Sequence, residues 1–268
     1  MILAHIAVLG SFMAAAATAA TASKDLLTAV LIRVDQSGKG DFKKIQDAID
    51  SIPPNNSQLV FILVKPGVYR EKLVAPADKP FITLSGTRAS NTIMTWSDGG
   101  NIFESPTLSV LASDFAGRSL TIQVFSSLFD TLLDDTGSHY YSNCYIEGAT
   151  DFICGNAASI FERCHLHSIF KNNGSITAQH RDSLTQDSGF TFLGCKITEI
   201  GSAYLGRPWC YGPGANRGHR VEWSQSLSQQ EAAPFLTKAM IGGQSWLRSS
   251  PTYFKRSSTI IKGHAPNN

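Results

Sequence analysis

Three residues in the second half of the chain carry groups suited to acyl transfer. Asp151 lies in the run Gly-Ala-Thr-Asp-Phe that begins at Gly148, Asp130 precedes Thr-Leu, and Arg207 lies in Leu-Gly-Arg-Pro-Trp. An ionised carboxylate can attack an ester carbonyl, a protonated carboxylate can supply a proton to the leaving group, and an arginine favours the charged form of a neighbouring carboxylate. A single Asp more often caps a turn, so the spacing of these residues has to support the interpretation.

A repeated pattern supplies that spacing. The sequence aromatic-x-x-Cys-x-apolar occurs three times, around Cys144, Cys164 and Cys195, which lie 20 and then 31 residues apart. Short repeats of this size with turns and no long amphipathic helix predict a solenoid of stacked strands. The fold class is therefore all-β.

The two carboxylates occupy similar places in this repeat. Asp130 precedes Cys144 by 14 residues, and Asp151 precedes Cys164 by 13. Because stacked strands are about 4.8 Å apart, we expect the two carboxyl groups to lie within roughly 10 Å of each other. Neighbouring carboxylates do not both ionise easily, so one becomes a proton donor and the other stays charged.

Several motifs in order resemble one family. They are Gly-Val-Tyr-Arg-Glu from Gly67, Asp-Thr-Leu from Asp130, Tyr-Ile-Glu-Gly from Tyr145, Asp-Phe-Ile-x-Gly-Asn-Ala-Ala from Asp151, and Leu-Gly-Arg-Pro-Trp from Leu205. Together they resemble the pectin methylesterase (pectinesterase) family, from about Val34 to Trp246. This resemblance implies a right-handed parallel β-helix with short capping helices, and hydrolysis of the methyl esters of polygalacturonate to pectate and methanol.

The resemblance also implies a role for each site residue. Asp151 would be the nucleophile, Asp130 the acid and then the base, and Arg207 the group that holds Asp151 ionised. Arg207, Trp209 and Phe152 would contact the substrate, although core packing is the alternative for both aromatic residues. The family needs no metal and no organic cofactor. Pectin is the expected partner, with a proteinaceous inhibitor as a second one, and the expected state is a monomer.

The chain departs from the family at two junctions. Family members place a glutamine just before the first catalytic aspartate and another about one coil earlier, as donors to the oxyanion. Here Phe129 precedes Asp130, and Gln123 lies in the preceding predicted strand, so we do not assign it that role. After Trp209 the family continues through further coils, whereas Cys210 leads almost directly into a Gly/Pro loop. We therefore predict missing segments near 124–129 and at 210–211.

The N-terminal segment predicts the compartment. Residues 1–22 are apolar and then rich in Ala and Thr, which favours a cleaved secretory signal over a membrane anchor. Residues 23–268 would then form one pectinesterase-like domain, secreted to the cell wall. The net charge of +2, without any Lys/Arg run, gives no indication of nucleic-acid binding.

The five cysteines and seven histidines are less decisive. Cys144, Cys164 and Cys195 fit a ladder of buried thiols as well as they fit disulfides. Cys154 and Cys210 lie outside that ladder, and their state is left open. The histidine and cysteine spacings do not resemble a zinc site.

Periodicity predicts the remaining elements. Helices are expected over 42–52, capping one end of the solenoid, and over 231–240. Tyr69 and Glu71 are expected to be structural. Strands are expected at 30–34, 59–64, 67–69, 81–84, 92–96, 108–111, 120–125, 175–180 and 190–197.

Two other functions stay open at this point. One is a pectin-binding β-helix without catalysis, which the missing glutamines favour. The other is a calcium-dependent polysaccharide lyase, which needs several clustered carboxylates and a basic proton abstractor. Only the pair Asp134 and Asp135 is available for that role, and such pairs more often cap a turn.

Overall fold

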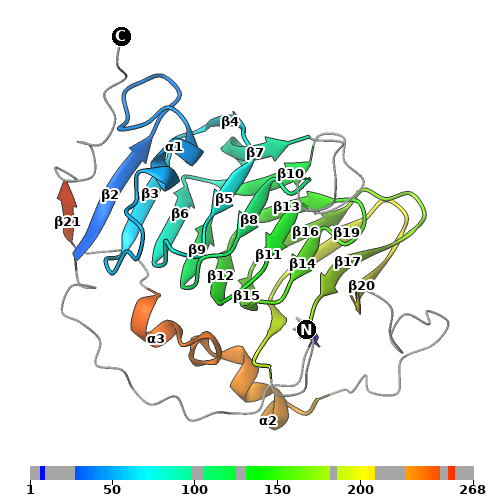
Figure 1. The fold of residues 1–268 in the computed structure, drawn as a ribbon. Coiled ribbons are helices and arrows are strands. Elements are labelled where there is room, and N and C mark those ends of the chain that lie inside the picture. Colours follow the sequence, from blue (N-terminus) through cyan, green and yellow to red (C-terminus); the bar gives the residue numbers. More distant parts are fainter. Residues whose placement is uncertain are drawn as a thin grey trace.

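The computed structural model describes residues 7–9, 28–97, 105–124, 131–181, 186–208, 227–247 and 253–256. Through this part the chain winds over three mostly parallel sheets, which we call A, B and C (Figure 1). Each coil adds one strand to A, the next to B and the next to C. The predicted right-handed parallel β-helix is confirmed.

The strands of each sheet follow in their spatial order. Sheet A holds β1 (Ala7–Leu9), β18 (Gly189–Leu193), β15 (Ala158–Glu162), β12 (Ser138–Ser142), β9 (Phe115–Arg118), β6 (Ile82–Gly86), β3 (Val60–Val64), β2 (Thr28–Val34) and β21 (Tyr253–Arg256). Sheet B holds β19 (Lys196–Glu199), β16 (His165–Ser168), β13 (Tyr145–Gly148), β10 (Thr121–Val124), β7 (Thr92–Trp96) and β4 (Gly67–Arg70). Sheet C holds β20 (Ser202–Pro208), β17 (Asn173–Gln179), β14 (Ile153–Gly155), β11 (Leu132–Asp134), β8 (Leu108–Val110) and β5 (Leu73–Ala75).

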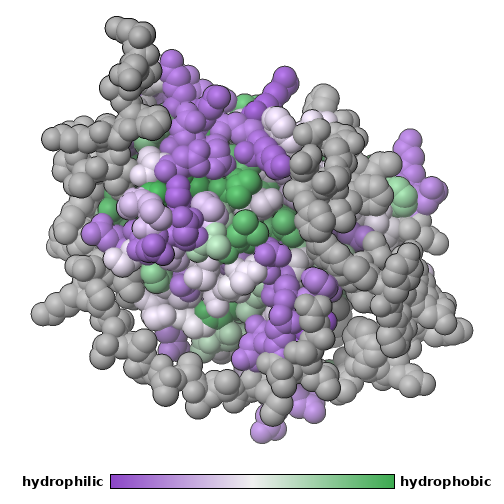
Figure 2. Space-filling model, viewed as in Figure 1, coloured by the Kyte–Doolittle hydropathy of each residue, from purple (hydrophilic) through white to green (hydrophobic). Residues whose placement is uncertain are grey.

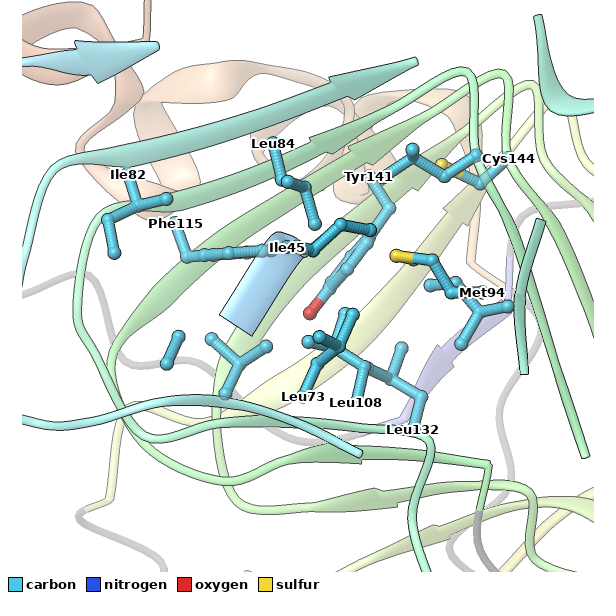
Figure 3. Close-up of a cluster of buried hydrophobic side chains, with 14 of the residues drawn as sticks. Ile45, Leu73, Ile82, Leu84, Met94, Leu108, Phe115, Leu132, Tyr141 and Cys144 are labelled. Carbon is cyan, nitrogen blue, oxygen red and sulfur yellow. The ribbon is translucent and has the colours of Figure 1, made fainter. Parts of the chain in front are cut away.

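The core fills the inside of the solenoid with ladders of like residues. Leu73, Leu108 and Leu132 stand opposite one another on successive strands of sheet C, and their side chains lie together in Figure 3. On sheet A, the rings of Tyr141 and Phe161 stack with centroids 4.8 Å apart, and those of Phe161 and Phe192 with centroids 5.0 Å apart. Each added coil buries more apolar side-chain surface, and this burial stabilises the fold by about 25 cal/mol per Å² removed from water.

The repeat predicted from the sequence is the turn from sheet A to sheet B. Cys144, Cys164 and Cys195 each precede a strand of sheet B, and those strands pair in register. All three are free thiols, as is the buried Cys154, whereas Cys210 lies outside the described residues. The strand predicted over 190–197 is wrong, because Gly194, with φ +60°, and Cys195 turn the chain between β18 and β19.

A short helix closes the first end of the solenoid. Helix α1 (Ile45–Asp50) is shorter than predicted, and Ile45, Ala48 and Ile49 enter the core. Glu71 accepts hydrogen bonds from the N–H groups of Ile45 at 3.2 Å and Gln46 at 3.0 Å. A carboxylate at a helix N-terminus satisfies its free donors. Tyr69 is fully buried, so both residues are structural, as expected.

The C-terminal elements cover sheet A. They are α2 (Gln229–Ala232), η4 (Ala233–Leu236), η5 (Lys238–Ile241) and α3 (Gly243–Trp246), with η2 (Ala89–Asn91) elsewhere in the chain. Ile241 and Trp246 pack on Tyr140 and Ile160 of the outer face. The single helix predicted over 231–240 is wrong. Ala233 begins a separate 3₁₀ turn with Pro234 in its first turn, and an extended Thr237 separates it from the next.

The last coil exposes side chains that earlier coils bury. Ile197 stands opposite the buried Leu166 but is 43% exposed, and Ile200 and Tyr204 are 60% and 46% exposed. Within the described residues, β19 and β20 have a partner strand on one side only. On β18, the outer edge pairs antiparallel with β1, which falls in the predicted signal segment.

Candidate active site

Asp151 lies at the corner where sheet B passes into sheet C, between β13 and β14. Its φ is +54°, a left-handed conformation that few residues other than glycine adopt but that Asp tolerates. Its N–H donates to the Ser175 carbonyl at 2.7 Å, and the Ser175 hydroxyl donates to its Oδ1. The side chain is 5% exposed, so the carboxylate is held by one neighbouring coil.

The residues around this corner explain its shape. A Cβ on Gly148 would lie 2.2 Å from the Cβ of Phe152 and 2.4 Å from Oγ1 of Thr131. Only glycine fits there. Thr131 Oγ1 donates to the Glu147 carbonyl at 2.9 Å, and the Phe152 carbonyl accepts from the N–H of Leu132 at 2.9 Å. The Gly-Ala-Thr-Asp-Phe run thus forms a tight corner locked to the preceding coil.

The other predicted site residues are only partly placed. Asp130 and Trp209 lie outside the described residues. Leu132 pairs with Ile153, and Asp130 and Asp151 each precede that pair by two positions in the sequence. The backbone of Arg207 is in β20 opposite Ala178, which itself stands opposite Cys154. The strands that follow Asp130 and Asp151, and the strand of Arg207, therefore belong to one sheet.

Phe152 has the packing role rather than the substrate role. Its side chain is fully buried and belongs to the main core. A ring inside the solenoid offers no face to a sugar, so the predicted substrate contact does not hold in this structure. The sequence allowed this alternative, because an aromatic residue after a corner can point either way.

Small apolar residues line the outer face of sheet C beside the corner. Leu133, Cys154 and Ala178 form a buried cluster of their own, in register with the backbone of Arg207. Farther along the same sheet, Figure 2 shows hydrophobic residues gathered over β5 and β8, with hydrophilic residues above and below. Apolar residues therefore lie on the outer face of sheet C next to the Asp151 corner and also over β5 and β8.

A second carboxylate, Asp134, has a structural role that the sequence did not predict. Its Oδ1 accepts from His139 Nδ1 at 2.7 Å and from the Tyr141 hydroxyl at 2.6 Å, and its Oδ2 accepts from Ser159. All four side chains are buried. The expectation that Asp134 caps a turn is therefore wrong, and its oxygens are already occupied. That occupancy argues against the calcium-dependent lyase.

His139 in this network carries a proton. Burial lowers the pKa of His139, but the charge of Asp134 and the hydrogen bonds to Asp134 and to the Ala112 carbonyl raise it by more. Both ring nitrogens face acceptors, at 2.7 and 2.8 Å, and only the imidazolium donates from both. Asp134 and His139 thus form a buried ion pair under sheets A and C.

Two further features are absent from the described residues. This part of the chain has no group of three or more His, Cys, Asp or Glu residues that could hold a metal ion. Helices long and apolar enough to cross a membrane are likewise absent from it.

Known proteins resemble this chain in sequence. A model of the pectinesterase family matches residues 31–127 and 124–211. The Arabidopsis thaliana protein "Putative pectinesterase 11" is 54% identical over 299 aligned positions, which cover 87% of this chain and 85% of that protein. "Pectinesterase QRT1" of the same plant is 33% identical over 300 positions, covering 81% of this chain and 79% of its own length.

Solved structures resemble it in fold. Pectin methylesterase from carrot has a TM-score of 0.63 at 24% identity, over 88% of this chain and 99% of that one. The deglycosylated pectin methylesterase of Aspergillus niger, with an N-acetylglucosamine stub, has a TM-score of 0.51 at 26% identity, over 70% of this chain and 73% of that one.

The matches also locate missing segments. The alignment with the 54% identical relative has 299 positions, whereas 87% of 268 residues is about 233, so about 66 of its positions face gaps in this chain. The family model matches in two pieces that meet at 124–127, and the second ends at 211. The overlap at 124–127 coincides with the first predicted junction, and the junction at 210–211 stays a prediction. The motifs, the β-helix and these matches agree: the chain belongs to the pectinesterase family.

Proposed function

We propose that this chain acts on pectin and that Asp151 is the nucleophile of methyl ester hydrolysis. The observation that carries the proposal is the corner that holds Asp151, where the Ser175 hydroxyl donates to the carboxylate and the Ser175 carbonyl accepts from the N–H of Asp151. In this scheme the carboxylate of Asp151 attacks the ester carbonyl, and Asp130 protonates the departing methoxide. Asp130 then takes a proton from the water that hydrolyses the acyl-enzyme, releasing pectate.

Arg207 and Trp209 complete the proposed site. Arg207 keeps Asp151 ionised and contacts the substrate, and Trp209 supplies a ring face for a sugar. The register of β20 with β17 and β14 supports this assignment for Arg207, because only one strand separates it from the strand that follows Asp151. The reaction needs neither a metal nor an organic cofactor.

The rate is limited by the oxyanion. The two glutamine donors of the family are missing, and Phe129 stands where one belongs. Gln123 does not replace them. It alternates with the buried Ile122 on β10 and stands on the outer face of sheet B between Thr95 and Glu147. Removing one oxyanion donor lowers the rate by about 10²–10³, so we expect esterase activity far below that of an intact relative.

A pectin-binding protein with impaired catalysis is the second candidate. The divided family match supports it, because its two pieces overlap at 124–127, a few residues before Asp130. Such a chain keeps the face that binds the polymer and loses the groups that stabilise the intermediate.

Methanol release from methylated pectin tests both candidates. The proteins are the chain as written, its Asp151→Ala variant, and a chimaera that carries the relative's residues at the two junctions. We expect slow release by the chain, faster release by the chimaera, and none when Asp151→Ala is placed in the chimaera. A chain as fast as the intact relative refutes the impairment. A folded chimaera without release, or unsaturated uronides absorbing in the ultraviolet, refutes the esterase.

The proposal includes a location and an assembly. The leader of residues 1–22 would be removed near residues 20–23, and the protein would act in the cell wall as a monomer, with a proteinaceous inhibitor as a further partner. Sequencing the N-terminus of the secreted protein tests this. Recovery of the intact chain from inside the cell, beginning at Met1, contradicts it.

A further inference from the structure

Two histidines stand side by side on the outer face of sheet B. His165 and His167 alternate with the buried Leu166 on β16, so both rings point away from the core. The ring centroids are 6.1 Å apart. His165 Nε2 lies 2.8 Å from the hydroxyl oxygen of Thr198, and His167 Nδ1 lies 2.7 Å from that same oxygen. Both imidazole nitrogens therefore point at the same atom, Oγ1 of Thr198 on β19.

Two imidazole nitrogens that point at one place from the same strand can bind a single metal ion. Imidazole suits Cu²⁺, Ni²⁺ and Zn²⁺, which bind it at about 2.0–2.1 Å. In the metal-free protein the two nitrogens share the Thr198 hydroxyl as a hydrogen-bond partner, and an ion bound to both has to displace that hydroxyl. We propose that His165 and His167 form a two-imidazole site for a divalent transition-metal ion, with Cu²⁺ bound most tightly.

The neighbouring strands set the charge around this site. Glu147 on β13 stands opposite His167, and its carboxylate accepts a hydrogen bond from Tyr145 at 2.5 Å. It contributes a negative charge one strand from the ion. Lys196 stands opposite His165 and opposes binding. In the described part of the chain no third His, Cys, Asp or Glu joins the two histidines as a metal ligand. Water therefore fills the remaining coordination positions of the ion, and the two imidazoles alone set its affinity.

The site lies on one coil, beside the last one, and is separate from the ester chemistry. His165 and His167 belong to β16, and Thr198 belongs to β19 of the last coil. An ion held here stays on sheet B, whereas Asp151 lies at the corner of sheets B and C. A ligand that binds only the folded chain stabilises it by mass action, so the ion should raise the stability of the folded protein.

Titration of untagged protein with Cu²⁺ tests the proposal. Calorimetry gives the affinity, and electron paramagnetic resonance reports nitrogen ligands. The variants are His165→Asn and His167→Asn, each made alone, with His180→Asn as the matched control and the thermal midpoint as a check on folding. We expect nitrogen coupling in the parent, at least tenfold weaker binding in each of the two variants, and unchanged binding in the control.

The opposite results would overturn the proposal. They are a parent spectrum without nitrogen ligands, or an affinity that neither His165→Asn nor His167→Asn changes. A supporting readout uses Zn²⁺, which should raise the thermal midpoint of the parent and not that of His167→Asn. Equal rises in both would also count against the site.

Discussion

Replacing Asp134 with Asn should destabilise the fold far more than the same replacement at an exposed aspartate. Asp134→Asn has the same shape and keeps one carbonyl oxygen for His139 and Tyr141. It removes the charge that pairs with His139, which is fully buried. Breaking a buried pair by removing one partner costs about 3–5 kcal/mol. Because Asn retains an acceptor, we expect a loss near the lower end, about 3 kcal/mol, from a typical total of about 5–15 kcal/mol.

The pH dependence of this loss follows from His139. The pKa of His139 is raised in the folded protein, so the unfolded chain releases its proton at a lower pH than the folded chain. The stabilisation from His139 is complete below its unfolded pKa, about 6.5, and disappears as the pH rises through the raised folded pKa. A neutral ring donates only one N–H, so Asp134 or the Ala112 carbonyl then loses its donor.

Urea unfolding at pH 6 and pH 9 measures both effects. Asp135→Asn is the matched control. Asp135 is the adjacent carboxylate, and it accepts from Thr136 at 2.9 Å on the surface, so its change should stay within about 0.5 kcal/mol. The difference between parent and Asp134→Asn should be largest at pH 6 and smaller at pH 9. A loss below about 1 kcal/mol, or a difference that does not shrink as the pH rises, would refute the ion pair.

Three further predictions concern the backbone, the thiols and the first helix. Gly155→Ala should prevent normal folding, because at φ +122° its Cβ would lie 2.1 Å from the backbone oxygen of Asp134. Gly242 has φ +60° and nothing within 4 Å of an added Cβ, so Gly242→Ala should lower the free energy of unfolding by only about 1 kcal/mol in thermal unfolding. Alkylation of the native protein, mapped by mass spectrometry, should label the partly exposed Cys195 before the buried Cys164; the reverse order would contradict the open last coil. Glu71→Gln should destabilise the fold by about 1 kcal/mol in urea, because Glu71 accepts from two N–H groups of α1, and an unchanged midpoint would contradict that role.

The features that repeat from coil to coil could be predicted from the sequence, whereas side-chain contacts between neighbouring coils could not. The ladder of Cys144, Cys164 and Cys195 gave the number of residues per coil, so the solenoid and most strands follow from it. Coil-to-coil register then places Asp151 at a corner. The contact between Asp151 and Ser175 was missed because the two residues are 24 positions apart and Ser175 has no motif of its own. Extending the cysteine register by one coil points to residues 181–182 instead, because Cys164 and Cys195 are 31 residues apart rather than 20.

The Asp134 network was missed for a different reason. A sequence gives the carboxylate but not its depth, and the pair of Asp134 and Asp135 looks the same whether it caps a turn or faces the core. The buried His139, five residues later, is the signal that was available, because a histidine and a carboxylate separated by one turn can meet across it. The helix predicted over 231–240 failed on Pro234, whose effect on a helix interior is known from sequence alone.

The two junctions separate the stability of this chain from its chemistry. A solenoid is stabilised by contacts between neighbouring coils, so removing whole coils leaves the others able to stack. The six coils of the described residues pair from strand to strand on all three sheets, and their inward side chains form one large buried cluster. The proposed catalytic groups follow a different rule, because misplacing one by about 1 Å lowers the rate about 10²-fold. A deletion next to Asp130 would therefore remove oxyanion donors without unfolding the β-helix. For this reason we expect a chain that folds and binds its polymer but turns over slowly, and restoring the junctions should raise its activity more than its stability.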